Sequence, residues 1–142
     1  MGTDSLAQTA SRWLTSRTMD AFFEILRHTE DDIGPYLAQR FNELVEHPLV
    51  GVAETCGFVA GLVLVKDKAH KTPFASELSV GMVCRKHCFN NGLIMRAVGD
   101  RMIVAPPLIM DEALVDELLA RIRFCLDRTL ADLTQRGWLP QG

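Results

Sequence analysis

A surplus of basic residues is missing from this sequence. Fifteen Lys and Arg residues stand against 18 Asp and Glu residues, which leaves a formal net charge of −3 over 142 residues. Proteins that bind nucleic acid gather Lys and Arg on one face, because phosphate contacts supply much of their affinity. No basic stripe of this kind runs through the chain. Nucleic-acid binding therefore has no electrostatic support.

Long apolar runs and a secretory signal are also missing. No apolar run approaches the roughly 20 residues that a bilayer-spanning helix needs. Residues 1–17 are polar and lack the apolar core of a signal peptide. The cysteines do not cluster in loops and are spread through apparent core segments, at Cys56, Cys84, Cys88 and Cys125. We therefore expect a cytoplasmic protein with reduced thiols and no membrane partner.

Common catalytic and nucleotide-binding motifs are absent. No serine lies in a G-x-S-x-G elbow, no glycine-rich phosphate loop precedes a helix, and the four histidines belong to no recognisable motif. One cluster, Cys84-x-x-His87-Cys88, would place two thiols on one face of a helix. No second ligand pair follows at a suitable spacing. We therefore predict no metal site and interpret the two cysteines as small packing residues.

What the sequence does have is the composition of one globular domain. Hydrophobic residues make up 48% of the chain and charged residues 23%, with no repeat, linker or low-complexity tract. A chain of 142 residues can bury one continuous core. Its mean hydropathy of +0.10 is somewhat apolar for so small a protein, which is typical of a chain with a face that meets a partner.

The first third of the chain predicts helices. Residues 1–17 are interpreted as a weakly structured lead-in, and apolar residues recur at three- and four-residue spacing from Thr18 onward. The acidic residues that follow Thr29 are typical of a new helix start. A second apolar stripe begins at Ile33, and Pro48 ends it.

The rest of the chain predicts a small sheet and two more helices. β-Branched and apolar residues predict strands over residues 50–54, 58–65, 93–98 and 101–105. The second of these strands barely alternates, which indicates burial on both faces. Helices are predicted over residues 77–91 and 111–135. The order of the elements predicts an α+β fold: a small, largely antiparallel sheet with helices on one side.

One arginine, Arg96, lies inside an otherwise apolar strand, just before the predicted turn at Gly99 and Asp100. A guanidinium keeps its charge and is costly in an apolar setting unless it meets an anion. A carboxylate offers it a planar, two-point partner, so Arg96 is a candidate substrate-binding residue. An ion pair with Asp100 or Glu54, or plain exposure to solvent, accounts for the spacing at least as well.

Six groups of short motifs follow one another between about residue 18 and about residue 135. They are Asp32-Ile-Gly-Pro-Tyr-Leu37 with His47-Pro-Leu-Val-Gly51, Gly57-Phe-Val-Ala-Gly61, Leu64-Val-Lys-Asp67, Thr72-Pro-Phe74, Gly92-Leu-Ile-Met-Arg-Ala-Val-Gly-Asp100 and Ala105-Pro-Pro-Leu108. In order and spacing they resemble the C-terminal small domain of fold-type I, class III aminotransferases, above all the ω-amino acid:pyruvate transaminases. The resemblance implies that residues 18–142 form this domain.

The resemblance also implies a coenzyme and a role for Arg96. In this family pyridoxal phosphate is bound as a Schiff base to a lysine of the large domain, and an amino group passes to a keto acid such as pyruvate. Arg96 matches the mobile arginine that binds the substrate carboxylate. The four lysines do not match the Schiff-base position; they are Lys66, Lys68, Lys71 and Lys86. We therefore expect no catalytic residue here and no pyridoxal phosphate bound by this chain alone.

The match departs from the family pattern on two strands. Relatives carry an acid-Val-Arg-Gly run where this chain has Val52-Ala-Glu-Thr55, and a glutamate where Val63 stands. These losses indicate relaxed selection or a surface with a new use.

Two functions follow as expectations. The first is a partial class III aminotransferase, truncated or detached, which is inactive alone and completes an active site in another chain. The second is a non-catalytic module whose face toward the former large domain is covered by self-association or by a partner. An independent enzyme that uses Arg96 and a cysteine ranks below both.

Overall fold

Four strands form one antiparallel sheet in the order β1-β2-β4-β3. The structure, a computed structural model, describes residues 17–140. The strands are β1 (Val50–Cys56), β2 (Val59–Leu64), β3 (Arg96–Val98) and β4 (Arg101–Val104). Each neighbouring pair is antiparallel, and tight turns at Gly57 and Gly99, both with positive φ, join β1 to β2 and β3 to β4.

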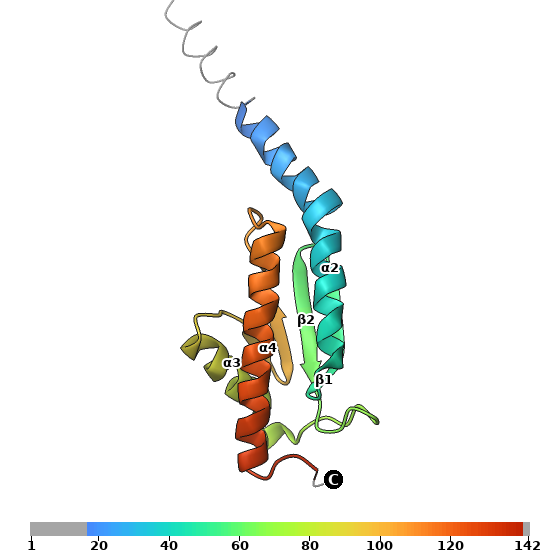
Figure 1. Cartoon of the computed structure of the whole chain (residues 1–142), viewed down its shortest axis with the longest axis vertical. Coiled ribbons are helices and arrows are strands. Elements are labelled where there is room, and N and C mark those ends of the chain that lie inside the picture. The colour runs from blue at the N-terminus through green and yellow to red at the C-terminus, as the bar shows by residue number, and fades with distance from the viewer. Residues whose placement is uncertain (1–16, 141–142) are drawn as a thin grey trace, which may run out of the picture.

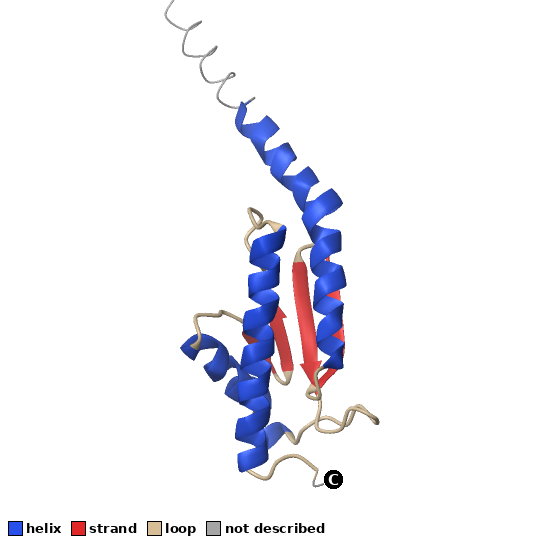
Figure 2. Ribbon diagram, in the orientation of Figure 1, coloured by secondary structure: helices blue, strands red, loops and turns tan. Residues whose placement is uncertain are grey.

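Helices cover one face of this sheet, and the helical residues 17–27 extend beyond its end (Figures 1 and 2). The elements that follow residue 27 are the α-helices α2 (Gly34–Asn42), α3 (Val80–Asn90) and α4 (Glu112–Gln135), the π-helical segment η1 (His28–Ile33) and the 3-10 turns η2 (Glu43–Glu46) and η3 (Ser76–Leu78). Helices α2 and α4 lie side by side on the sheet, and α3 packs against α4 and against β3 and β4 (Figure 1). The predicted α+β fold, with helices on one side of the sheet, is confirmed.

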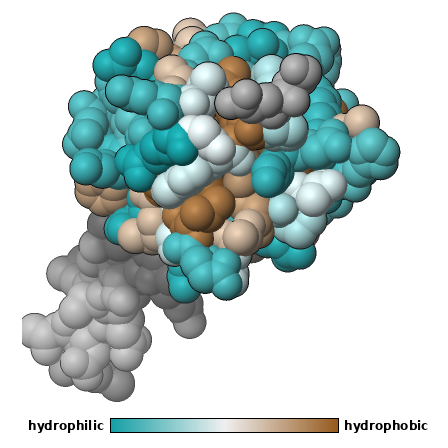
Figure 3. Space-filling view, turned by 90° about the horizontal axis from the view of Figure 1, so that it is seen from below, coloured by the Kyte–Doolittle hydropathy of each residue, from teal (hydrophilic) through white to brown (hydrophobic). Residues whose placement is uncertain are grey.

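The core lies between the helices and the inner face of the sheet. Leu37 and Phe41 of α2, Leu62 of β2, Met102 of β4 and Leu126 of α4 are all fully buried. Each side chain of this size stabilises the fold by about 1.5–3 kcal/mol when it leaves water. At the end of the molecule shown in Figure 3, hydrophilic residues surround a smaller group of apolar ones. None of the helices formed by residues 17–140 is long and apolar enough to cross a membrane.

Strand β2 corrects one prediction, because it is buried on one face only. Ala60, Leu62 and Leu64 point into the core, whereas Val59 is 45% exposed and Val63 is partly exposed. The inner residues alternate with outer ones as in any half-covered sheet. Within residues 17–140, no second layer of the chain covers the outer face.

The predicted helix start at Thr29 is also wrong. Residues 17–27 are helical and continue through η1 into α2 without a break. The Thr29 hydroxyl donates to the carbonyl oxygen of Ile25 at 2.8 Å, inside the helix, so Thr29 is not an N-cap. The predicted lead-in over residues 1–17 lies outside the described residues except for Arg17, which is helical.

Two further boundaries differ from the predictions. Helix α3 begins at Val80, three residues later than predicted, because Ser79 takes a left-handed conformation with φ of 48° and ends the turn η3. Strand β3 begins only at Arg96, so residues 93–95 are a connection and not part of the ladder.

Candidate functional site

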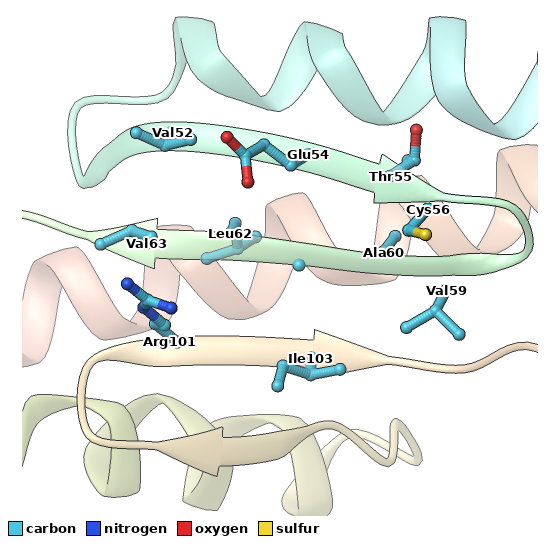
Figure 4. A pocket seen from close by; sticks show the side chains of 11 residues that line it. Val52, Glu54, Thr55, Cys56, Val59, Ala60, Leu62, Val63, Arg101 and Ile103 are labelled. Atoms are coloured by element: carbon cyan, nitrogen blue, oxygen red, sulfur yellow. The ribbon is translucent and has the colours of Figure 1, made fainter.

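The outer face of the sheet is a shallow, mostly apolar hollow of about 420 Å³ (Figure 4). The strand register decides which side chains reach it. Val52, Val63 and Arg101 form one cross-strand row. Glu54, Gly61 and Ile103 form the next row. Figure 4 looks onto this face, with the helices behind the sheet, and shows that Glu54 and Arg101 are the charged side chains among the labelled valines and isoleucine.

Arg96 lies on the same outer face, on the edge strand β3. Its register partner is Ile103, so it continues the row that begins at Glu54 and passes through Gly61. The Arg96 side chain is exposed, and within residues 17–140 it makes no hydrogen bond or ion pair. The guanidinium is therefore available to a ligand.

The two ion pairs considered for Arg96 do not form. Three strand spacings of about 4.8 Å separate Glu54 from Arg96, which places their backbones roughly 14 Å apart. The Asp100 carboxylate instead accepts a hydrogen bond from the backbone N–H of Gly81 at 3.2 Å. Of the alternatives left open by the sequence, exposure to solvent is the one that the structure shows.

The turn that follows Arg96 is held against the first turn of α3. A Cβ atom on Gly81 would lie 2.0 Å from the carbonyl oxygen of Gly99, so only glycine fits at this contact. The Asp100 carbonyl also accepts from the N–H of Leu64, at 2.8 Å. Helix α3 and strand β2 thus fix the hairpin that carries Arg96.

The cysteine cluster belongs to the core. Cys84 and Cys88 of α3 are buried together with Cys125 of α4. The hydrogen bond with the Cys84 thiol, and burial, raise the pKa of Cys88, and burial raises the pKa of Cys125. The His87 carbonyl oxygen accepts from the Cys125 thiol at 3.8 Å, whereas the His87 ring contacts Asp132 of α4 at 3.0 Å. No group of three or more His, Cys, Asp and Glu side chains in residues 17–140 is arranged to hold a metal ion.

None of the four lysines lines the hollow of Figure 4 or contacts Arg96, and all four are exposed. The Lys68 ammonium donates to the carbonyl oxygens of Val45 and His47. The described residues therefore offer no lysine beside the candidate carboxylate site, and they do not by themselves fit an imine-bound coenzyme.

One polar cluster that sequence analysis missed joins α2 to α4. The Arg40 guanidinium donates to Asp116 at 2.8 Å and also to Glu43, and the Tyr36 hydroxyl donates to Asp116 at 2.9 Å. Arg40, and then Tyr36, lower the pKa of Asp116. Every charge here has a partner, so the cluster is structural; its members lie 76 and 80 residues apart in the chain, which no local pattern reveals.

Comparison with known proteins gives the class of the protein. No family model matches the chain. Its sequence is 51% identical over 108 residues to the putrescine–pyruvate aminotransferase of Pseudomonas aeruginosa, which covers 76% of this chain and 24% of that protein. It is 32% identical over 109 residues to the diaminobutyrate–2-oxoglutarate transaminase of Halomonas elongata, covering 75% of this chain and 23% of that protein.

Solved structures agree with these sequence matches. The crystal structure of an omega-transferase from Vibrio fluvialis JS17 superposes with a TM-score of 0.73 at 34% identity, over 78% of this chain and 26% of that one. The pyridoxamine phosphate-bound form of an aminotransferase from Vibrio fluvialis superposes with a TM-score of 0.70 at 35% identity, over 76% and 24%.

The likeness in both sequence and fold defines an aminotransferase domain. The chain belongs with the class III aminotransferases, as its motifs predicted. It spans about a quarter of the length of the curated relatives it matches.

Proposed function

We propose that this chain supplies the substrate-carboxylate part of a transaminase active site, with Arg96 as the binding residue. One observation supports the proposal above the others: the Arg96 guanidinium is exposed on the outer face of the sheet and has no partner within residues 17–140. A planar fork of N–H donors held on a rigid hairpin suits a carboxylate, which accepts two parallel hydrogen bonds.

In this proposal the coenzyme is held outside these residues. Pyridoxal phosphate, when bound, supplies the electron sink of transamination. The residues of this chain bind and orient the carboxylate end of the amino or keto acid. We expect the chain alone to be inactive and to form no specific imine: borohydride reduction of a mixture with pyridoxal phosphate should label none of the four lysines selectively. One lysine modified stoichiometrically would contradict this.

The test of Arg96 needs the active site assembled with a coenzyme-bearing large domain. Arg96→Ala is expected to lower kcat/KM for a keto acid such as pyruvate by about 100-fold, since a charge-assisted two-point contact is lost. The half-reaction with a simple amine donor that has no carboxylate, followed in a single turnover, should change less than threefold. Arg128→Ala, which removes the same charge from the exposed surface of α4 on the other side of the sheet, is the matched control. Equal losses for the keto acid and the amine would remove the specific role of Arg96.

A second function, a self-associating or partner-binding module, is favoured by the hollow of Figure 4. Valine and isoleucine side chains on the outer face of the sheet are more typical of a covered surface than of a wet one. We propose that this face meets another copy or a large domain. Sedimentation of the chain alone at increasing concentration tests self-association, and a monomer at all concentrations would leave only the large domain as occupant.

A further inference from the structure

A second hollow, of about 300 Å³, lies where α3 meets β3 and the connection before it. It shares no lining residue with the hollow of Figure 4. Its walls are Met82 and Arg85 of α3, and Ile94, Met95, Arg96 and Ala97. The volume is at the small end of the range for ligand sites in proteins.

The charge of this hollow is unbalanced. Two arginines, Arg85 and Arg96, are among its lining residues, and no Asp or Glu is. Neither arginine makes an ion pair or a side-chain hydrogen bond within residues 17–140, whereas Arg40, Arg121 and Arg136 each hold a carboxylate. Two like charges beside one small space repel each other, and an anion placed between them relieves both.

The Arg85 side chain is already oriented. Its guanidinium carbon lies 5.0 Å from the ring centroid of Phe89, one helical turn along α3. Stacking on an aromatic ring restricts the guanidinium plane and leaves its N–H edges available for a planar acceptor. Little further ordering is then needed when a carboxylate binds.

The rest of the lining is apolar and open. Met82 is 51% exposed and Ile94 is 75% exposed, so both offer uncovered aliphatic surface beside the two cations. A ligand that matches this arrangement carries a negative charge at each end and a short aliphatic chain between them. A monocarboxylate satisfies only one of the two guanidinium groups.

We propose that Arg85 and Arg96 form a two-point site for a short aliphatic dicarboxylate, with its methylene chain against Met82 and Ile94. Each carboxylate accepts hydrogen bonds from one guanidinium. The site shares Arg96 with the proposed function and rests on it in one respect only: a dicarboxylate bound here competes with a substrate carboxylate for Arg96.

The experiment is a titration of the isotopically labelled chain with glutarate at low salt, followed by amide chemical shifts. Saturable shifts are expected over residues 82–97. Butyrate, which has one carboxylate on a chain of similar length, is expected to bind at least fivefold more weakly. Arg85→Gln and Arg96→Gln should each weaken glutarate binding about tenfold, as expected for the loss of one charge-assisted pair.

Lys86→Gln is the matched control. Lys86 is adjacent to Arg85, carries the same charge and does not line this hollow, so glutarate binding should stay within twofold. Glutarate binding that is unchanged in Arg85→Gln, weakened as much by Lys86→Gln, or no tighter than butyrate binding would overturn the proposal. Unshifted amides in α4 and β2 verify that each variant is folded. The result does not depend on transaminase activity, so this proposal and the proposed function can fail separately.

Discussion

His47 is a buried histidine whose hydrogen bonds define its tautomer. Its Nδ1 accepts from the backbone N–H of Leu49 at 3.2 Å, so the proton lies on Nε2, which donates to Asp127 of α4 at 3.2 Å. The side chain is 7% exposed, and burial lowers its pKa from the usual 6.5, against the opposing effect of Asp127. Lys68 and Arg123 also lower the pKa.

This arrangement predicts a pH-dependent stability. Because the folded-state pKa of His47 lies below its unfolded value, the unfolded chain takes up the proton first as the pH falls. The contribution of neutral His47 is therefore fully present above about pH 6.5 and is lost progressively below it. Urea unfolding at pH 7.5, 6.5 and 5.5 should show that the free energy of unfolding decreases as the pH is lowered. His47→Asn, which keeps an acceptor for Leu49, should flatten this dependence. Equal slopes in the unchanged chain and in His47→Asn would contradict the assignment.

At the scale of single residues, the sequence singles out Arg96 as a candidate, a prediction that stays untested, and it singles out neither Arg85 nor His47. Arg96 is noticeable in the chain because its neighbours are apolar and a turn follows. Arg85 precedes Lys86 and His87 in a polar helix turn, where one more cation indicates nothing. The partner of His47 on α4 is 80 residues away. Such roles depend on contacts between elements that lie far apart in the chain, and the spacing of neighbouring residues does not predict these contacts.

Among the elements, those with a local cap were predicted best. Helix α4 begins and ends within a residue of its predicted bounds, because the Asp111 carboxylate accepts from the N–H of Leu114 at 2.8 Å and a regular apolar stripe follows. Helix α3 was predicted to start too early, since the left-handed Ser79 gives no such signal. A helix boundary that a capping side chain marks can therefore be predicted from the sequence. A boundary that depends only on the backbone conformation of one residue cannot.

The contact between α3 and the β3–β4 turn gives a prediction about packing. In Gly81→Ala the new methyl group would overlap the carbonyl oxygen of Gly99, which forces the hairpin away from the helix. We expect a loss of about 1–3 kcal/mol in the free energy of unfolding. Gly61→Ala is the control, because its methyl group would meet only ordinary contacts at 3.7 Å from Met102, and we expect a change within about 0.5 kcal/mol. Thermal unfolding followed by circular dichroism measures both, and similar values for the two would contradict the tight contact.

For the molecule as a whole, β2 was predicted to be buried on both faces, and the structure shows that only its inner face is buried. Composition alone shows that a strand suits an apolar setting on both faces. It does not show whether the second face is covered by the same chain or by something else. The structure assigns the inner face to α2 and α4 and leaves the outer face uncovered within residues 17–140. The fold class was predictable from the order of the elements, and this division between faces was not.

The outer face of the sheet should tolerate an added charge, and the inner face should not. Val63→Glu places a carboxylate on the outer face directly across from Arg101, where a cross-strand pair of opposite charges is favourable. Its effect on the free energy of unfolding should stay within about 0.5 kcal/mol. Leu62→Glu, one residue away, buries a carboxylate in the core and should unfold the chain or destabilise it by more than about 4 kcal/mol. Urea denaturation distinguishes the two, and a severe loss in Val63→Glu would show that the outer face is packed after all.

The π-helical segment η1 determines which way the helix before it points. The Gly34 N–H donates to the carbonyl oxygen of Thr29, five residues back, and a Cβ on Gly34 would lie 2.6 Å from that oxygen. The segment thus accommodates one residue more than an α-helical turn. Deleting one residue there would rotate residues 17–27 by about 100° about the helix axis. The side chains of Phe22 and Phe23 would then point in a different direction. The extra residue in η1 therefore determines which side of the helix over residues 17–27 faces any surface that this helix contacts.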